Sequence, residues 1–350
     1  MKVLQLGPYP PPYGGVQTNL VAIRSFLRKR GIPCAVINVT RHRNAETDDV
    51  YYPSNAVQLL QLLASLRYDI VHQHFGGRLT NRILALSFAC TLRPGVKSVM
   101  TFHSGGFPST PEGMSLGRNS LAGVVLRRFD GLIAVNEEIM GFFRQLRVSP
   151  DRARVISPYS FLSDENSQCS FPDELGAFFA THDPVLISAG QLEPEYDLPL
   201  QIDAVANLRE RFPRVGLVLL GSGSIEKEIR ARIKARRSDE SVLLPGDVAH
   251  GATIEAITRA RIMLRTTWYD GDAISVREAM QVGTPVIATD NAMRPAGIRL
   301  IPKSDLTALL SAIEAELQRP MPRKERTPAD ESSLQEVFDF YQYLLADRRD

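Results

Sequence analysis

The chain has 350 residues, of which 44% are hydrophobic and 23% are charged, and its formal net charge at pH 7 is +2. These values are ordinary for a globular protein, and the length allows two domains. The sequence has neither a signal-peptide pattern nor an apolar run of about 18 residues that could span a membrane, and its three cysteines lack the spacing of a disulfide framework or a zinc site, so we expect a cytoplasmic protein.

Residues 1–160 alternate short apolar runs with amphipathic stretches. Val16, Leu20 and Leu27 fall on one helical face, and Gly31 is placed to end that helix. Strands that alternate with helices predict a doubly wound parallel sheet, in a Rossmann-like domain. The expected strands are Val3–Leu6, Ala35–Val39, Ile70–Phe75, Ser98–His103 and Leu132–Val135. The expected helices are Val16–Arg30, Ala56–Arg67, Leu79–Leu92, Asn119–Arg128 and Glu137–Arg147.

A polar stretch with several prolines, residues 161–184, predicts a linker with at most one short helix. The alternation then resumes over residues 185–333 and predicts a second Rossmann-like domain, followed by a helix within 334–350. Two such sheets would border one interdomain cleft at the carboxyl ends of their strands. The expected strands are Val185–Ser188, Gly216–Leu220, Val242–Leu244, Ile262–Leu264, Pro285–Ala288 and Arg299–Ile301. The expected helices are Leu198–Arg211, Ile225–Arg236, Thr253–Arg259, Ala273–Val282, Asp305–Glu316 and Leu334–Leu345.

Two glycine-containing loops link an expected strand to an expected helix. Gly14 and Gly15 open the first helix, where bare backbone and free N–H groups suit a phosphate or a sugar. Gly221 and Gly223 occupy the same place later in the chain. Neither loop has a dinucleotide or Walker pattern, which disfavours a dehydrogenase and an ATPase. A simple tight turn remains the alternative for the first loop.

Histidines end two strands of the first half. His72 and His74 lie on one face of their strand because side chains alternate. A metal pair is conceivable there, but no third ligand accompanies them, so we interpret His72 as a hydrogen-bonded core residue. His103 differs because Ser104 and Gly105 follow it, in a loop that can surround a small ligand.

The most specific pattern joins two acids around a helix start. Asp270 lies in a glycine-containing loop, and Glu278 lies in the helix that follows it. Two carboxylates held in this way can accept from vicinal hydroxyls, while the N–H groups at Gly271–Ser275 can hold a diphosphate. Read separately, the acids could be a residue near the helix cap and an exposed helix charge.

These motifs resemble those of the family 4 glycosyltransferases of the GT-B fold, over nearly the whole chain. The last block resembles the acid-x(7)-acid motif of that family, which usually has Glu at both ends. The blocks that occur in the order of the family are Gly14-Gly15, Asp69–His74, Thr101–His103, Ile133–Asn136, the strand end at Gly190, Gly221–Gly223, Gly246–Val248 and Asp270–Val286.

The resemblance implies an α/β enzyme of two Rossmann-like domains that moves a hexose-like sugar from a nucleotide-diphosphate sugar, with retention of configuration and without a metal or other cofactor. Asp270 and His103 would act at the transferred sugar, and Glu278 would bind the ribose. The last helix would pack back on the first domain. Donor-binding residues would be Gly14, Gly15, Gly190, Gly221, Gly223, Val248, Gly271, Asp272, Ala273, Ile274, Ser275 and Glu278. Acceptor-binding residues would be Tyr13, His74, Ser104 and Gly105.

One position departs from the resemblance. The family usually has an Arg and a Lys after the first strand of the second domain, but here Gln191 and Tyr196 take their places. Those cations neutralise the leaving diphosphate, so their loss would slow transfer. We therefore expect Arg265, at the end of a nearby strand, or Arg277 to supply the missing charge.

Charge is unevenly spread between the two halves. Residues 1–160 carry 19 Lys and Arg against 9 Asp and Glu, whereas residues 161–350 carry 22 against 30. A basic first half fits an anionic partner, and Val57–Leu66 and Ile83–Leu92 could rest on an anionic membrane, or could simply face the core. No nucleic-acid motif is present.

The acceptor implied is a glycan or a lipid-linked sugar, as in the assembly of surface polysaccharides or glycoconjugates. Two further classes stay open: a catalytically degenerate GT-B protein with a binding or regulatory role, and a nucleotide-sugar epimerase of the same fold.

Overall fold

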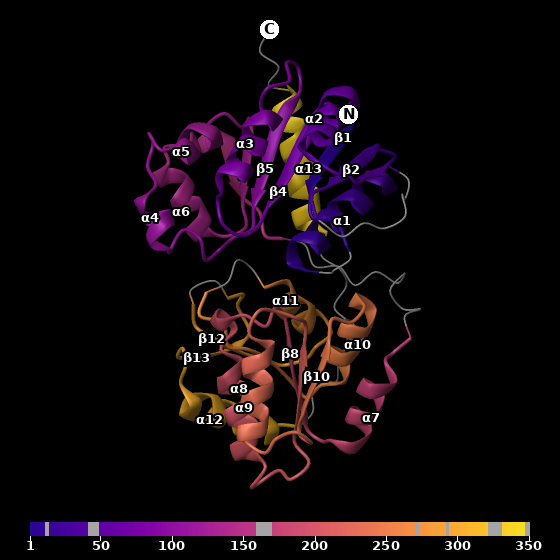
Figure 1. Cartoon of the computed structure of the whole chain (residues 1–350), viewed down its shortest axis with the longest axis vertical. Helices are drawn as coiled ribbons and strands as arrows, with labels where there is room; N and C mark the ends of the chain where they lie inside the picture. The colour runs from indigo at the N-terminus through magenta and orange to yellow at the C-terminus, as the bar shows by residue number, and fades with distance from the viewer. Residues whose placement is uncertain are drawn as a thin grey trace. The chain divides into compact units, whose positions relative to one another are not determined.

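A computed structural model describes the chain over residues 1–10, 14–40, 49–158, 170–269, 273–291, 294–320 and 331–346. The chain forms two compact units (Figure 1). The first comprises Met1–Tyr159 and Asp330–Asp350, and the second comprises Ser160–Ala329.

The first unit is built on a parallel sheet of seven strands in the order β3-β2-β1-β4-β5-β6-β7. The order runs outward in both directions from β1 and β4, which makes their carboxyl ends the topological switch point of a doubly wound sheet. The strands are β1 (Val3–Gly7), β2 (Cys34–Asn38), β3 (Val50–Tyr51), β4 (Ile70–Phe75), β5 (Lys97–Phe102), β6 (Gly131–Ala134) and β7 (Ala153–Val155).

Helices cover both faces of this sheet. Leu4, Val71 and Met100 point into a core shared with α2, α3, α5 and α6. Gln5 and His72 alternate with them and therefore face α1 and α13 on the other side. The helices are α1 (Gly15–Lys29), α2 (Ala56–Ser65), α3 (Asn81–Cys90), α4 (Pro111–Ser115), α5 (Leu121–Leu126), α6 (Glu137–Gln145) and α13 (Ser332–Ala346), with a 3-10 turn, η1, at Pro150–Arg152.

The helix α13 returns to the first unit after the whole second unit, and it packs beside α1 (Figure 1). It buries Leu334, Val337, Phe340, Tyr341 and Leu344. A Cβ atom on Gly131, which opens β6, would lie only 2.8 Å from both Leu344 Cδ1 and Phe340 Cε1. The missing side chain at this glycine therefore lets α13 lie close against the sheet.

The second unit holds a parallel sheet of six strands in the order β10-β9-β8-β11-β12-β13. Its switch point lies between β8 and β11. The strands are β8 (Val185–Ala189), β9 (Gly216–Leu220), β10 (Val242–Gly246), β11 (Ile262–Arg265), β12 (Val286–Thr289) and β13 (Arg299–Ile301). The helices are α7 (Asp173–Thr181), α8 (Leu198–Leu208), α9 (Glu226–Ala235), α10 (His250–Arg259), α11 (Ile274–Gln281) and α12 (Leu306–Leu317), with a 3-10 turn, η3, at Pro194–Tyr196.

Both sheets are parallel and doubly wound, so the predicted fold class of two Rossmann-like domains is confirmed. The prediction did not include β3, β7 and α4, which are too short to show a period. It assigned residues 161–184 to a linker with at most one short helix. Within the described part of that range lies α7, whose Leu175 and Phe178 are buried in the core of the second unit.

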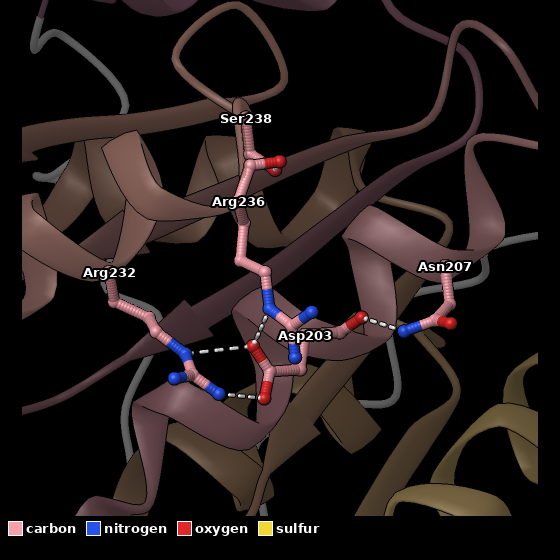
Figure 2. Close-up of polar contacts among 5 residues, drawn as sticks. All are labelled: Asp203, Asn207, Arg232, Arg236 and Ser238. Atoms are coloured by element: carbon pink, nitrogen blue, oxygen red, sulfur yellow. Dashed lines mark hydrogen bonds and ion pairs between the residues drawn. The ribbon is translucent and has the colours of Figure 1, made fainter.

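An ion-paired carboxylate joins α8 to α9 in the second unit (Figure 2). Asp203 Oδ1 accepts from Arg232 Nε at 2.9 Å and from Arg236 Nε at 2.8 Å, and Arg232 also reaches Oδ2. Asn207 donates to the Asp203 backbone carbonyl at 2.7 Å. Burial alone would raise the pKa of Asp203, but hydrogen bonds and charge from Arg236 and Arg232 outweigh it, and the pKa is lowered.

Candidate functional site

The carboxyl ends of β8, β9, β10 and β11 gather candidate residues at one edge of the second sheet, because all four strands run parallel. Gly190 follows β8, Gly221 follows β9, Val248 follows β10, and Arg265 ends β11. Ligands bind at this edge in open α/β sheets, next to the switch point.

Arg265 is the buried cation of this edge. Its side chain is 5% exposed, its Nη1 donates to the Ala189 carbonyl at 2.9 Å, and its guanidinium carbon lies 4.6 Å from the centre of the Tyr196 ring. A Cβ atom on Gly190 would come within 2.3 Å of Tyr196 Cε1 and 2.7 Å of Arg265 Nη1. Glycine at position 190 therefore makes room for both side chains, whereas Gln191 is exposed.

The start of α11 meets the same carbonyl group. Ser275 Oγ donates to the Ala189 oxygen at 3.2 Å, so the first turn of α11 and the guanidinium of Arg265 converge on one atom. Ala273 is the N-cap residue, and no side chain among the described residues caps this helix or adds an acid to its first turn. This end of α11 therefore presents N–H groups and a partial positive charge next to a buried cation.

Glu278 lies three residues after Ser275 and is 3% exposed. Its Oε1 is 2.7 Å from Nε2 of His250, the first residue of α10. Burial alone would lower the pKa of His250, but the hydrogen bond and charge of Glu278 outweigh it, and the pKa of His250 is raised. The bond to His250 holds the Glu278 carboxyl group in a fixed position at the site.

The second glycine loop has a packing role. Gly221 has φ +125°, and a Cβ there would lie 1.8 Å from the Gly190 oxygen, while a Cβ on Gly223 would lie 2.3 Å from the Leu192 oxygen. Ser224 N–H donates to Glu193 Oε1 at 2.9 Å. Close approach of the loops after β8 and β9 is thus sufficient to explain both glycines.

Four of the site residues expected in the first unit, His74, His103, Ser104 and Gly105, lie at the ends of β4 and β5. His74 Nδ1 is 3.3 Å from His103 Nε2, and His74 Nε2 is 2.7 Å from Gln5 Oε1. Burial lowers the pKa of His103 to about 3, and burial, with repulsion from neighbouring histidines, holds the pKa of His74 well below its usual range. Ser104 is half-buried and Gly105 is buried beside them. The low pKa values leave the rings of His74 and His103 neutral at pH 7.

His72 is the core residue that the sequence predicted. It is fully buried, and its two ring nitrogens lie 2.5 Å from Tyr341 Oη and 2.7 Å from Thr101 Oγ1. Gly14 is the N-cap of α1 and Gly15 its first residue; no side chain among the described residues caps α1.

The expected residues Tyr13, Asp270, Gly271 and Asp272 lie outside the described residues. Within the described ranges, no group of three or more His, Cys, Asp and Glu side chains is arranged to hold a metal ion.

Three contributing residues were not predicted. Gln5 was missed because it is a buried residue within a strand. His250 was missed because Ala249 gives no capping signal, so its helix was expected to begin only at Thr253. Arg294 donates to Thr267 Oγ1 at 2.6 Å and to the Thr289 carbonyl at 3.0 Å, which ties together the ends of β11 and β12.

Comparison with known proteins gives matches over both units. Residues 13–158 match the model of Glycosyltransferase Family 4, and residues 177–299 match that of Glycosyl transferases group 1. A curated relative is the human GDP-Man:Man(3)GlcNAc(2)-PP-Dol alpha-1,2-mannosyltransferase, with 31% identity over 142 residues. The match spans 37% of this chain and 29% of that protein.

Solved structures share the fold along the whole chain. Sucrose-phosphate synthase from Thermosynechococcus elongatus has a TM-score of 0.73 at 15% identity, covering 99% of this chain and 100% of that one. The Anabaena protein HepE in complex with UDP-glucose has a TM-score of 0.66 at 17% identity, covering 100% of this chain and 96% of that one. The two family models, which together span most of the chain, show that it belongs to the family 4 glycosyltransferases, and the solved structures show that it has the GT-B fold.

Proposed function

We propose that this protein transfers a sugar from a nucleotide-diphosphate sugar, bound by the second unit, to an acceptor bound by the first. The observation that carries the proposal is the convergence of Arg265 and Ser275 on the Ala189 carbonyl, with the buried Glu278 carboxylate one helical turn further on. A cation beside a helix N-terminus suits a diphosphate, and a fixed carboxylate suits the hydroxyls of a ribose.

Glu278 retains the capacity to accept from a ribose. An ionised carboxylate offers about four lone-pair positions, and the bond from His250 uses one of them. His250 thereby fixes the orientation of the carboxylate before the donor arrives. Such positioning lowers the cost of binding, because the side chain does not have to be ordered by the ligand.

Arg265 takes the part of the cations that the family usually has at the positions of Gln191 and Tyr196. It comes from the neighbouring strand, yet its guanidinium reaches the end of β8 and stacks near the ring of Tyr196. A positive charge fixed there would stabilise the diphosphate as it departs. Arg277, in the first half of α11, is the second candidate for this role.

Transfer is proposed to proceed with retention of configuration and without a metal ion. The acceptor would attack from the face that the diphosphate leaves, and the departing phosphate would take the acceptor proton. Negative charge grows on the phosphate as the bond breaks, so the helix end and Arg265 would bind the transition state more tightly than the ground state.

A ligand screen tests donor binding. UDP-glucose and GDP-mannose come first, because a structural neighbour binds the former and a relative is named for the latter; ADP- and dTDP-sugars follow. A donor at 100 times its dissociation constant should stabilise the protein by about 2.7 kcal/mol. Glu278→Gln should weaken this shift and Glu255→Gln, at a half-buried acid of α10 that pairs with Arg259, should not. Absence of a shift with every nucleotide sugar would contradict the proposal.

Transfer itself is tested with the stabilising donor. Release of the nucleoside diphosphate that rises on adding acceptor would establish the transferase and exclude a purely regulatory protein. Conversion of the donor into an epimer without acceptor would instead support an epimerase. The anomeric configuration of the product, measured by NMR, tests retention, and activity after treatment with EDTA tests the absence of a metal requirement.

The Arg265→Gln variant tests the catalytic part of the proposal. A hydrogen bond to a charged group contributes about 1.5–3 kcal/mol, and each 1.4 kcal/mol is a factor of about ten, so we expect turnover to fall about ten- to a hundred-fold. Arg261→Gln, a buried arginine at the opposite end of β11 that donates to the Glu316 carbonyl, is the matched control. A variant carrying both Arg265→Gln and Tyr196→Lys should regain part of the lost turnover. Unchanged turnover in Arg265→Gln would move the role to Arg277.

The acceptor is proposed to be a glycan or a lipid-linked sugar, reached at an anionic membrane surface. Helices α2, α3 and α5 pack on one side of the first sheet. Between residues 51 and 128 the sequence has eight Lys and Arg but only two acids, Asp69 and Glu112. Exposed large apolar residues of this side are Val57, Leu60, Phe88, Leu92, Leu121 and Val124. A basic surface with exposed apolar side chains suits the headgroups of anionic lipids.

Sedimentation with vesicles tests this contact. Vesicles rich in phosphatidylserine should bind the protein more tightly than phosphatidylcholine vesicles, and salt should weaken the binding. The double variant Leu60→Asp, Phe88→Asp should lose it, whereas Leu300→Asp, an equally exposed position in the second unit, should not. Equal binding to both kinds of vesicle, or none, would contradict the proposal. Among the helices of the described residues, none is both long enough and apolar enough to cross a bilayer.

A further inference from the structure

Three side chains of the first unit form a hydrogen-bonded line from the centre of the sheet to its carboxyl edge. Gln5 lies in β1, His74 in β4, and His103 directly after β5. Gln5 Oε1 is 2.7 Å from His74 Nε2, and His74 Nδ1 is 3.3 Å from His103 Nε2. Gln5 is fully buried and His74 is 4% exposed, so water does not compete for these bonds.

The amide of Gln5 has only one favourable orientation. Its Nε2 donates to the backbone carbonyl of Leu20 at 3.3 Å and lies 3.5 Å from Cys34 Sγ. A carbonyl oxygen can only accept a hydrogen bond, so the amide nitrogen must face Leu20. The amide oxygen is therefore the atom that faces His74, and it can only accept.

The position of each proton follows from this orientation. His74 must carry its proton on Nε2 in order to donate to Gln5. Because burial keeps the His74 ring neutral, its Nδ1 has no proton and accepts from His103 Nε2–H. His103 is also neutral, so its single proton lies on Nε2 and its Nδ1 holds a free lone pair.

His72 does not disturb this order. Its ring lies against that of His74, with centroids 4.2 Å apart and planes tilted by 35°, but its two nitrogens are engaged with Tyr341 and Thr101. It contributes packing to the line and exchanges no hydrogen bond with it.

We infer that Gln5 and His74 are positioning residues that hold His103 in its Nε2–H tautomer, so that Nδ1 accepts a hydrogen bond from a substrate hydroxyl. The inference rests on the proposed function, in which His103 contacts the substrate. An unprotonated nitrogen attracts a hydroxyl and repels the oxygens of a carboxylate or phosphate. The contact at His103 therefore selects a neutral sugar over a sugar acid.

Nitrogen-15 NMR of histidine-labelled protein tests the tautomer without any ligand or activity. At pH 7 the unprotonated ring nitrogen resonates far downfield of the protonated one, and comparison with His103→Gln assigns the signals. We expect the downfield signal of His103 to belong to Nδ1. An Nδ1–H tautomer, or averaged shifts from a mixture, would overturn the inference even if the protein proves to be an active transferase.

The Gln5→Met variant tests the origin of this order. Methionine fills a similar volume but gives His74 no acceptor oxygen, so the nitrogen shifts of His103 should move toward the averaged values of a mixture. Gln73→Met is the matched control, because Gln73 is 4% exposed in β4 and points to the other side of the sheet. Unchanged His103 shifts in Gln5→Met would overturn the role of Gln5. If Gln5→Met does not fold, the wild-type spectrum alone decides.

A substrate comparison tests the consequence. For each deoxy analogue of the donor or acceptor, the activity of wild type is compared with that of His103→Ala. The analogue that lacks the hydroxyl bound by His103 should react equally well with both proteins, whereas the other analogues should react better with wild type. If the difference between wild type and His103→Ala were the same for all analogues, His103 would make no specific contact with a hydroxyl. This outcome would leave the tautomer measurement and the transferase activity untouched.

Discussion

The hydroxyl oxygen of Tyr341 lies 2.5 Å from Nδ1 of His72, although 269 residues separate them in the sequence. Both side chains are fully buried. Burial lowers the pKa of His72 to about 3 and, together with repulsion from Cys34, raises the pKa of Tyr341 well above its usual range. The bond therefore joins two neutral groups, and it attaches α13 to the centre of the first sheet.

Tyr341→Phe should destabilise the first unit. The ring would still fill its place, but Nδ1 of His72 would lose its partner in a site that excludes water. An unpaired buried polar group costs about 1–3 kcal/mol, which urea unfolding can measure. Tyr343→Phe, on an exposed ring of the same helix, is the control and should change stability little. Equal stabilities of the two variants would contradict the importance of this bond.

Gly190→Ala should lower both donor affinity and stability. The new Cβ would lie 2.3 Å from Tyr196 Cε1 and 2.7 Å from Arg265 Nη1, so both side chains would have to move. We expect a smaller thermal shift with the donor and a lower melting temperature without it. Gly176→Ala in α7, where a new Cβ meets nothing within 4 Å, should preserve donor affinity. Wild-type donor affinity in Gly190→Ala would show that Arg265 need not occupy its observed position.

The His250–Glu278 pair should make stability depend on pH. Since the pKa of His250 is raised above its ordinary 6.5, the pair contributes stability below that pH. The contribution is lost as the pH rises through the folded-state pKa. His250→Gln keeps an N–H donor for Glu278 but does not titrate, so the free-energy difference between wild type and variant should shrink as the pH rises from below 6.5 through the raised folded-state pKa of His250. A constant difference over that range would mean that His250 stays neutral.

Asp203→Asn should weaken the joint between α8 and α9. The pKa of Asp203 is lowered, so its ion pairs contribute stability above its ordinary value of 3.8, and the contribution is lost as the pH falls through the lower folded-state pKa. We expect a loss of about 1–3 kcal/mol at neutral pH that disappears in acid, measured by unfolding at several pH values. Asp239→Asn, an exposed change in the turn after α9, should show no such loss. A loss that persists unchanged in acid would exclude the ion pairs as its cause.

Much of the fold could be predicted because parallel strands buried on both faces have continuous apolar sequences. Residues 216–220 are such a run, and they form β9 with the predicted bounds. The two-residue β3 and three-residue β7 could not be predicted, since a period needs several residues to appear. The part of the expected linker that became α7 is helical because Leu175 and Phe178 pack on the second sheet, and that contact is not visible in local sequence.

The residues of the candidate site could be predicted where a local sequence pattern places them, but the contacts between residues of different helices or strands could not. Glu278 and Ser275 were expected from their place around a helix start, and Arg265 from its place at a strand end. The Glu278–His250 contact joins two helices, and the Gln5–His74 contact joins two strands that are 69 residues apart. Spacing along the chain gives no signal for such pairs, because they form only when the elements pack.

The return of α13 to the first sheet has a consequence for how the protein is made. A ribosome completes residues 1–158 and the entire second unit before it synthesises Tyr341, so the hydrogen bond between His72 and Tyr341 can form only at the end of translation. The second unit can fold on the nascent chain, whereas the first unit still lacks α13. Truncation of α13 would therefore destabilise the first unit, which is synthesised before the second.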